Sequence, residues 1–174
     1  MILILSASLN PESNSRVLAQ EAHLTLEQEG HSAQVLDLRE HPLPLCDGDA
    51  AYGHPNVARV RDLVAAANAI IVATPIYNYD GTAALKNLIE LTGRAWENKV
   101  VAFLCAAGGQ SSYMSIMPLA NSLMLDFRTI VVPRFVYATG DHFSGGKLSD
   151  PEQIRRVAEL ARTVAKLGAV VRAA

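Results

Sequence analysis

A short segment near the N-terminus is rich in side chains that can donate hydrogen bonds to an anion. Residues 6–16 read SASLNPESNSR, with four serines and two asparagines, and they open directly into a segment with helical periodicity. The first turn of a helix has free backbone N–H groups, and the helix dipole favours negative charge there. Ordinary helix capping by Ser13 or Ser15 would need only one such side chain. The surplus of donors therefore favours a phosphate site.

Two later segments could contact a flat ring. Residues 74–81 (TPIYNYDG) follow the most hydrophobic run of the chain, and residues 106–112 (AAGGQSS) are rich in glycine, which lets backbone N–H groups approach a planar ligand. Each segment alone is weak evidence, because glycine and asparagine also fill ordinary turns. Together with the serine-rich segment they predict a bound mononucleotide. The serine-rich segment has neither a G-x-G-x-x-G nor a G-x-x-x-x-G-K-[ST] sequence, so dinucleotide and Walker A loops do not explain it.

The elements that must position these segments are visible in the hydrophobic pattern. Five aliphatic runs without alternation predict strands buried on both faces, at residues 2–5, 35–38, 69–73, 100–106 and 130–132. Between them, apolar residues three and four positions apart predict helices, the last of which begins at Asp150-Pro151. This alternation predicts an α/β fold with a five-stranded, doubly wound parallel sheet in the order 2-1-3-4-5.

Two predicted helices are apolar on more than one side. They lie at residues 82–92 and 113–127, and such helices need a second covering surface. That surface could be a neighbouring loop of the same chain or a second copy of it. We expect a second copy, in a homodimer or a homotetramer joined through both helices. Two other features also leave alternatives open. Trp96 could line a partner's active site or pack in the core, and residues 39–55 form one long loop that is either functional or mobile.

Composition narrows the class of protein. The 174 residues fit a single domain over 1–174, with 50% hydrophobic residues, 18% charged residues and a net charge of −2. This balance lacks the concentrated positive charge that favours nucleic acid or an anionic membrane as a partner. The apolar residues 1–5 are too few for a membrane span. Two distant cysteines and five scattered histidines predict no disulfide and no metal site, and a cytoplasmic location.

Over nearly its whole length the chain resembles the NADPH-dependent FMN reductases of the flavodoxin-like superfamily. The resemblance rests on residues 6–15, on the segment TPIYNYDGTAALKN with its P-x-Y-N and L-K-N motifs, and on Gly108-Gly109. It implies a flavodoxin-like three-layer sandwich and a cofactor-binding site without catalytic side chains or a metal. The implied phosphate contacts are Ser8, Asn10, Ser13, Asn14 and Ser15. The implied isoalloxazine contacts are Pro75, Ile76, Tyr77 and Asn78, and those of the pyrimidine edge are Ala107, Gly108, Gly109 and Gln110.

The resemblance implies an FMN-dependent oxidoreductase. It would pass a hydride from NADPH or NADH through bound FMN to a small acceptor such as a quinone, free flavin or azo compound, in a ping-pong cycle. Asn10 stands where the family usually has arginine, so we expect only modest selectivity for NADPH. Residues 79–83 also differ from the family's usual run of small residues and proline. Two alternatives remain: a flavodoxin-like electron carrier without pyridine-nucleotide turnover, and a binding module that has lost its cofactor.

Overall fold

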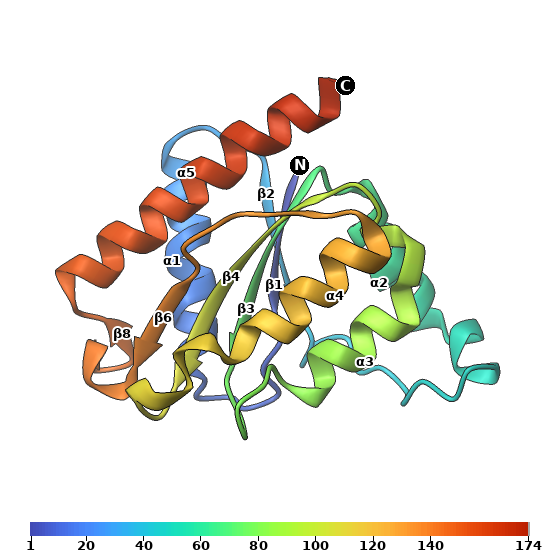
Figure 1. Cartoon of the computed structure of the whole chain (residues 1–174), viewed down its shortest axis with the longest axis horizontal. Helices are drawn as coiled ribbons and strands as arrows, with labels where there is room; N and C mark the ends of the chain where they lie inside the picture. The colour runs from blue at the N-terminus through green and yellow to red at the C-terminus, as the bar shows by residue number, and fades with distance from the viewer. Residues whose placement is uncertain (174) are drawn as a thin grey trace.

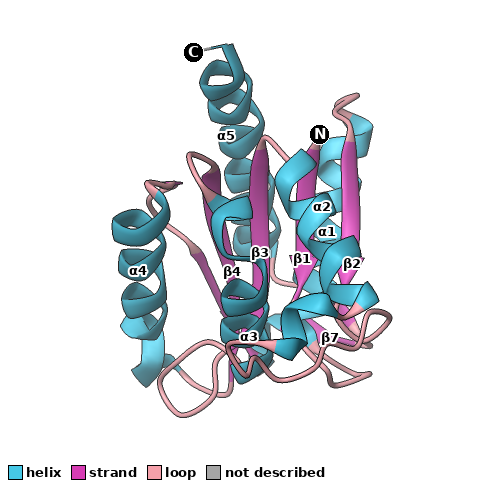
Figure 2. Cartoon of the chain, turned by 90° about the vertical axis from the view of Figure 1, so that its right-hand side faces the viewer, coloured by secondary structure: helices cyan, strands magenta, loops and turns pink. Residues whose placement is uncertain are grey.

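A parallel sheet forms the centre of the molecule. The structure is a computed structural model that describes residues 1–173. Strand β1 (Ile2–Ser6) lies between β2 (Ala33–Asp37) and β3 (Ala69–Pro75), and β4 (Val100–Ala107) follows β3. The order β2-β1-β3-β4-β5 confirms the predicted topology. Figure 2 shows β2, β1, β3 and β4 side by side.

Helices cover both faces of this sheet, as predicted. One face packs against α1 (Asn14–Gln28) and α5 (Pro151–Ala173), and the other packs against α2 (Pro55–Ala66), α3 (Ala83–Thr92) and α4 (Met117–Phe127). Figure 1 shows these two helix layers on opposite sides of the strands. Successive strand residues alternate between the layers, because neighbouring side chains point to opposite faces. Ile4 thus packs toward α1 and α5, whereas Leu5 packs toward α2, α3 and α4.

The predicted start of the last helix is confirmed in detail. The Asp150 carboxylate accepts a hydrogen bond from the backbone N–H of Gln153 at 2.8 Å, and Pro151 is the first residue of α5. Proline suits this position because its missing N–H would have no partner within the helix.

Strand β2 is not buried on both faces, which corrects the prediction for residues 35–38. The strand begins two residues earlier and ends one residue earlier, as Ala33–Asp37, and Leu36 is its only buried residue. Val35 is 36% exposed, whereas every residue of β3 is buried. The physical reason is position, because β2 is the edge strand and has β1 as its one neighbour. An aliphatic run alone does not separate an edge strand from a central one.

The last position of the sheet is filled by two short strands instead of one. Strand β5 (Ile130–Val131) pairs with the start of β4, and β6 (Val136–Thr139), which the hydrophobic pattern did not predict, pairs with its end. Between them lie Pro133, which has no N–H to donate, and Arg134, whose φ of 60° is left-handed. These two residues interrupt the ladder. The sheet therefore has six strands in five positions.

Short elements complete the chain. They are the 3₁₀ turns η1 (Ala50–Gly53), η2 (Gly93–Trp96), η3 (Gln110–Ile116) and η4 (Gly140–His142), and the hairpin strands β7 (Phe143–Ser144) and β8 (Lys147–Leu148). Trp96 is fully buried, and its indole Nε1 donates to Thr92 Oγ1 at 2.8 Å. Of the two alternatives for Trp96, the structure therefore favours core packing. Within the loop of residues 39–55, η1 packs Ala51 against Val57 and Leu91.

The two doubly apolar helices differ in how they are covered. In α3 the large apolar residues are all buried within the chain, with Leu91 packed against Ala51 of the long loop. For α3 the covering surface is thus a neighbouring loop of the same chain, so its apolar side chains are not left exposed as expected and do not call for a partner. In and before α4, several side chains remain exposed: Met114 at 59%, Met117 at 38%, Met124 at 39% and Leu125 at 75%.

Candidate functional site

Three loops meet at the carboxyl edge of the sheet. They follow β1, β3 and β4, and we call them the first, second and third loops, at residues 7–13, 76–82 and 108–112. The ladder continues into them, because Ala7 N–H donates to Ala73 O at 2.9 Å and Ile76 N–H donates to Ala106 O at 2.8 Å. Ligands of open parallel sheets bind beyond this edge. The structure thus brings the three groups of predicted site residues to one end of the molecule.

The first loop is held in shape by its own side chains. Ser8 Oγ accepts from the backbone N–H of Asn10 at 3.2 Å, and Asn10 Oδ1 accepts from the N–H of Glu12 at 3.0 Å. Ser8 is almost fully buried, whereas Asn10 is exposed. Of this pair, Asn10 is the side chain that can meet a ligand directly.

The start of α1 has free donors. Ser13 occupies the N-cap position without a side-chain capping bond within residues 1–173, because its hydroxyl is paired with that of Ser15 at 2.7 Å. In the described part of the chain, the backbone N–H groups of Asn14 and Ser15 also have no acceptor. Ordinary capping therefore does not explain the serines here. The N–H groups and the helix dipole together suit an anion.

A further buried hydroxyl lies directly beneath this loop. Ser6, the last residue of β1, is fully buried, and its Oγ has no hydrogen-bond partner among the residues that the structure describes. Like Ile4, it points to the face covered by α1, since strand side chains alternate. Unpaired buried hydroxyls are uncommon and costly. The strand that leads into the first loop thus also ends on a hydroxyl without a partner.

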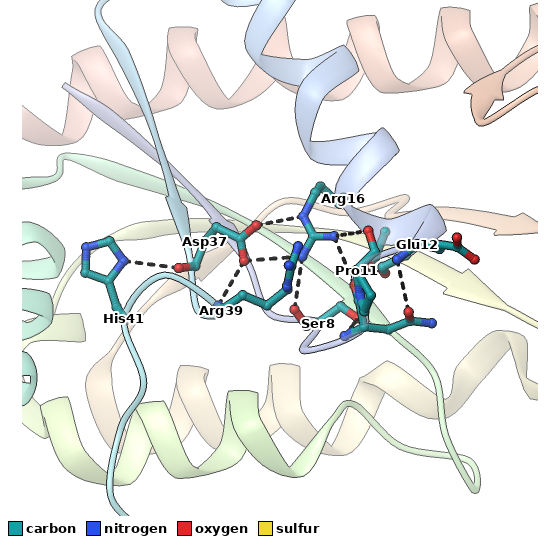
Figure 3. Close-up of polar contacts among 10 residues, drawn as sticks. Ser8, Pro11, Glu12, Arg16, Asp37, Arg39 and His41 are labelled. Atoms are coloured by element: carbon teal, nitrogen blue, oxygen red, sulfur yellow. Dashed lines mark hydrogen bonds and ion pairs between the residues drawn. The ribbon is translucent and has the colours of Figure 1, made fainter.

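The first loop is anchored by a charged residue that sequence reasoning missed. The Arg16 guanidinium donates to the backbone oxygens of Asn10 at 2.9 Å and Pro11 at 2.8 Å, and its Nε donates to Asp37 Oδ2 at 2.6 Å. A further contact joins Arg16 Nη2 to Asp37 Oδ1 at 3.3 Å. Figure 3 shows Arg16 between the loop and the end of β2. The partner, Asp37, lies 21 residues away, so no local pattern reveals the pair.

The electrostatics of this pair are coupled to folding. Burial by itself raises the pKa of Asp37, but hydrogen bonds from Arg16 and from the Arg39 N–H, together with both positive charges, outweigh it and leave the pKa below its usual value. A carboxyl with a lowered folded-state pKa stabilises the fold above its unfolded-state pKa, and this contribution is lost as the pH falls through the folded-state value. The pair is therefore fully effective at neutral pH and weakens below about pH 4.

The second loop presents two tyrosines on a tight turn. Tyr77 and Asp80 exchange backbone hydrogen bonds at 2.9 and 3.0 Å, and the central residues Asn78 and Tyr79 have φ values of 50° and 64°. Positive φ at both central positions is the geometry of a type I′ turn, which tolerates asparagine well. Tyr77 is 54% exposed and Tyr79 is 63% exposed. Flat rings are thus available at the edge of the sheet.

Not every predicted residue of the second loop offers its side chain. Ile76 is only 7% exposed and packs in the core, so its backbone alone is available to a ligand, and Pro75 is a buried residue of β3. At the end of the loop, Thr82 Oγ1 donates to Ala7 O at 3.1 Å and accepts from Leu85 N–H at 3.2 Å. Thr82 therefore caps α3 and ties it to the first loop.

The third loop is open to solvent on one side and is held on the other by hydrogen bonds with β6. A Cβ added at Gly108 or Gly109 would meet nothing within 4 Å, so the backbone there faces free space. Tyr137 Oη donates to Gly109 O at 2.5 Å, and Gln110 Nε2 donates to Thr139 Oγ1 at 3.3 Å. Both partners belong to β6, the strand that the hydrophobic pattern did not predict, so sequence reasoning missed them as well.

Two kinds of site are not found in the described part of the chain. Among residues 1–173 there is no group of three or more His, Cys, Asp or Glu side chains that could hold a metal ion. None of the described helices is both long enough and apolar enough to cross a bilayer. The histidines that have polar contacts serve local structure, as where His54 Nδ1 accepts from Asn56 N–H at the start of α2.

Replacing Asp37 by asparagine tests the anchor of the first loop. The amide group would place a donor against the Arg16 donors, so we expect the free energy of unfolding at pH 7 to fall by about 1.5–3 kcal/mol. The difference from the unmodified protein should shrink as the pH falls below about 4, because the Asp37 carboxyl takes up a proton first in the unfolded chain and then, at lower pH, in the folded protein. Urea unfolding between pH 3 and pH 7 measures both effects.

The matched control is Glu152→Gln, which removes an ion pair with Arg155 whose side chains are 58% and 62% exposed. Exposed pairs of this kind contribute less than about 1 kcal/mol. Equal losses in the two variants would contradict a special role for the Arg16–Asp37 pair.

The chain is similar in sequence to known flavin-dependent reductases. The sequence profile of the NADPH-dependent FMN reductases matches residues 1–143. An NAD(P)H-dependent FAD/FMN reductase of Geobacillus thermodenitrificans is 36% identical over 74% of this chain and 71% of its own. An FMN-dependent NADH:quinone oxidoreductase of Bordetella petrii is 31% identical over 80% of this chain and 83% of its own.

A solved structure supports the fold. The apo form of an NADH:FMN oxidoreductase superposes with a TM-score of 0.78 at 18% identity, over 94% of this chain and 87% of that one. It shares the flavodoxin-like arrangement seen here. With residues 1–143 matched by the profile, the chain belongs to the NADPH-dependent FMN reductase family, whose members are NAD(P)H-dependent oxidoreductases that use FMN.

Proposed function

We propose that FMN binds across the three loops, with its phosphate at the start of α1. The observation that carries this proposal is the uncapped helix start, where the N–H groups of Asn14 and Ser15 have no acceptor within residues 1–173. The paired hydroxyls of Ser13 and Ser15 can each turn to donate to a phosphate oxygen. Asn10 and the backbone around Ser8 complete the phosphate contacts.

The isoalloxazine ring would lie over the second and third loops. Tyr77 offers an exposed aromatic face, and Pro75, Ile76 and Asn78 contribute backbone and turn atoms around it. The open backbone of Gly108 and Gly109, with Ala107 and Gln110 on either side, would face the pyrimidine edge. Neutral donors and flat surfaces of this kind suit a planar ring better than a charged substrate.

The chemistry belongs to the cofactor, and the chain supplies its orientation. When bound, FMN accepts a hydride from NAD(P)H and passes it to a second substrate. The backbone N–H groups of the third loop would stabilise negative charge at the pyrimidine edge, so no side chain must act as acid, base or nucleophile. Cys105 does not serve as a nucleophile, because burial raises the pKa of its thiol to about 12.

The acceptor in this proposal is a small planar molecule such as a quinone, free flavin or azo compound. The Bordetella petrii relative is by name a quinone oxidoreductase, which supports this class of acceptor. We propose that the acceptor replaces the nicotinamide on one ring face, which gives a ping-pong cycle. Selectivity for NADPH over NADH should be modest, because the neutral Asn10 cannot offer the phosphate a charged contact.

The alternative function is an electron carrier with the same cofactor but no pyridine-nucleotide turnover. Carriers dock transiently through complementary charge. This chain instead has a net charge of −2 and an apolar exposed side of α4. These features support the enzyme over the carrier.

We also propose that the protein is a homodimer, or a dimer of such dimers, assembled through α4. The exposed Met114, Met117, Met124 and Leu125 form the uncovered apolar side of this helix and of the turn before it. Methionine and leucine side chains of this kind are typical of interfaces between subunits. Two free cysteines, Cys46 and Cys105, fit the reducing cytoplasm that we propose as its location.

Removing both α1 hydroxyls tests the phosphate site. The double variant Ser13→Ala with Ser15→Ala should weaken FMN binding by about 2–4 kcal/mol, because it removes two charge-assisted hydrogen bonds. Titration of the flavin-free protein, followed by quenching of FMN fluorescence, gives the dissociation constant. The control pair, Ser32→Ala with Ser144→Ala, changes two exposed serines outside the three loops. Unchanged FMN affinity of the Ser13/Ser15 double variant would show that the phosphate binds elsewhere.

Kinetics tests the function itself. The purified protein should be yellow, should bleach on addition of NADPH or NADH without oxygen, and should give parallel lines in double-reciprocal plots with two different acceptors. The KM values for the two nicotinamide coenzymes should be similar. Intersecting lines would indicate a ternary complex and contradict the shared ring face. Bleaching by dithionite but not by NAD(P)H would favour the electron carrier.

Light scattering at micromolar concentration tests the assembly. We expect the mass of a dimer or tetramer, and Leu125→Asp should shift it toward the monomer, because the carboxylate would have to be buried in the interface. The matched control is Leu24→Asp on α1, whose side chain is 50% exposed. A monomeric mass of the unmodified protein would contradict the proposed interface.

A further inference from the structure

A cavity of about 510 Å³ lies beside the candidate flavin site. Its wall combines Leu9 of the first loop, the loop that follows β2, and the first turns of α3, and we call it the α3 pocket. Leu9 follows Ser8, and Ala83 follows Thr82, so two elements of the flavin site also form the border of this pocket. A volume of this size suits a small organic molecule.

The wall of the α3 pocket is mostly apolar and is exposed to solvent. Leu9 is 61% exposed and Leu45 is 83% exposed, and Pro42, Leu43 and Ala84 also line the pocket. Exposed leucines lose contact with water when a ligand covers them, which favours binding of an apolar group. The lining therefore fits a flat hydrocarbon ring.

Hydrogen bonds hold this wall in place. Asn87 of α3 donates through Nδ2 to Pro44 O at 2.9 Å and accepts through Oδ1 from the N–H of Cys46 at 2.8 Å. From α2, Asn56 Nδ2 donates to Pro42 O at 2.8 Å. The loop after β2 is thus fixed to two helices, and the pocket is formed before any ligand binds. Pre-formed sites lose less ordering entropy on binding.

The pocket also has one positive charge that forms no ion pair within residues 1–173. Arg39 belongs to its wall, and its guanidinium has no carboxylate within 4.0 Å among residues 1–173. The nearby Asp37 is already paired with Arg16 at 2.6 Å. Figure 3 shows the Arg39 side chain beside this pair, next to the first loop. His41 adds a second polar group: its Nδ1 lies 3.1 Å from Asp37 O, and its Nε2 has no hydrogen-bond partner among the described residues.

We propose that the α3 pocket binds the aromatic part of an electron acceptor that carries an anionic substituent, such as a sulfonate or a carboxylate. The apolar wall would cover the ring, and Arg39 would bind the anion. This inference rests on the proposed oxidoreductase function and names the substrate class within it. For a naphthoquinone sulfonate, the hydride of NAD(P)H and one proton from water reduce the quinone to the quinol, NAD(P)⁺ is released, and the sulfonate is unchanged.

The test compares 1,4-naphthoquinone-2-sulfonate with neutral 1,4-naphthoquinone as acceptors of the holoenzyme. In Arg39→Ala the ratio of the sulfonate KM to the neutral KM should rise about tenfold, because one charge-assisted contact is lost. The matched control is Arg59→Ala on α2, an exposed arginine that is not part of the pocket wall. There the ratio should stay within about twofold, since long-range charge effects are screened.

A second measurement does not depend on turnover. Calorimetry with naphthalene-2-sulfonate, which cannot be reduced under these conditions, should show binding to the holoenzyme that Arg39→Ala weakens. Ala84→Leu should weaken it too, because the larger side chain fills part of the pocket. If turnover were absent but this binding remained dependent on Arg39, the proposed function would fail while the pocket assignment stood.

Two results would overturn the inference. Equal changes in Arg39→Ala and Arg59→Ala would show a general charge effect instead of a site. In Arg39→Ala, the KM of NADPH could rise without a rise in the KM of NADH and without a change in the ratio of the two acceptor KM values. That result would show that Arg39 binds the phosphate group that NADPH has and NADH lacks.

Discussion

Parallel pairing of β1 with β3, and of β3 with β4, is the constraint on which the rest of the structure depends. Every residue of β3 is buried, so the backbone of this strand must satisfy its hydrogen bonds within the sheet. Parallel strands end at the same edge, and the ladder runs one step further into the first two loops. The register of the strands therefore brings the three loops together, and this does not depend on contacts between the side chains of the loops.

Charge at this edge is arranged so that the anion site needs little net positive charge. Arg16, the cation nearest the first loop, is neutralised by Asp37 and donates to loop carbonyls, so it shapes the loop instead of facing a ligand. The anion is left with N–H groups, hydroxyls and the dipole of α1, which together can bind a phosphate. Because Asp37 is engaged with Arg16, Arg39 keeps its charge available on the neighbouring surface.

Much of this architecture was predictable from sequence, and the exceptions share a cause. Runs such as residues 69–73 and 100–106 predict strands buried on both faces, and the strand order was predicted correctly. The burial of β2 and the existence of β6 were not, because both depend on which strands pair in space: β2 has β1 as its one neighbour, and β6 pairs with the end of β4. In the site, the predicted ligand-facing residues of each loop are neighbours in the sequence, so a local pattern could reveal them. Their supports, Asp37 and Tyr137, act over 21 and 28 residues and leave no local pattern.

The three loops differ in how firmly they are held, and this difference bears on selectivity. The first loop is fixed by Arg16, and the third is fixed by Tyr137, so a ligand that binds them loses little entropy by ordering them. Within residues 1–173, the tip of the second loop is held only by the hydrogen bonds of its own turn, and Tyr77 and Tyr79 are more than half exposed. The rigid first loop, at the proposed phosphate, favours tight cofactor binding. The open second loop, at the proposed isoalloxazine ring, gives many acceptors access. Discrimination between acceptors must then come from a surface beyond the ring, and the α3 pocket is the pre-formed surface beside it.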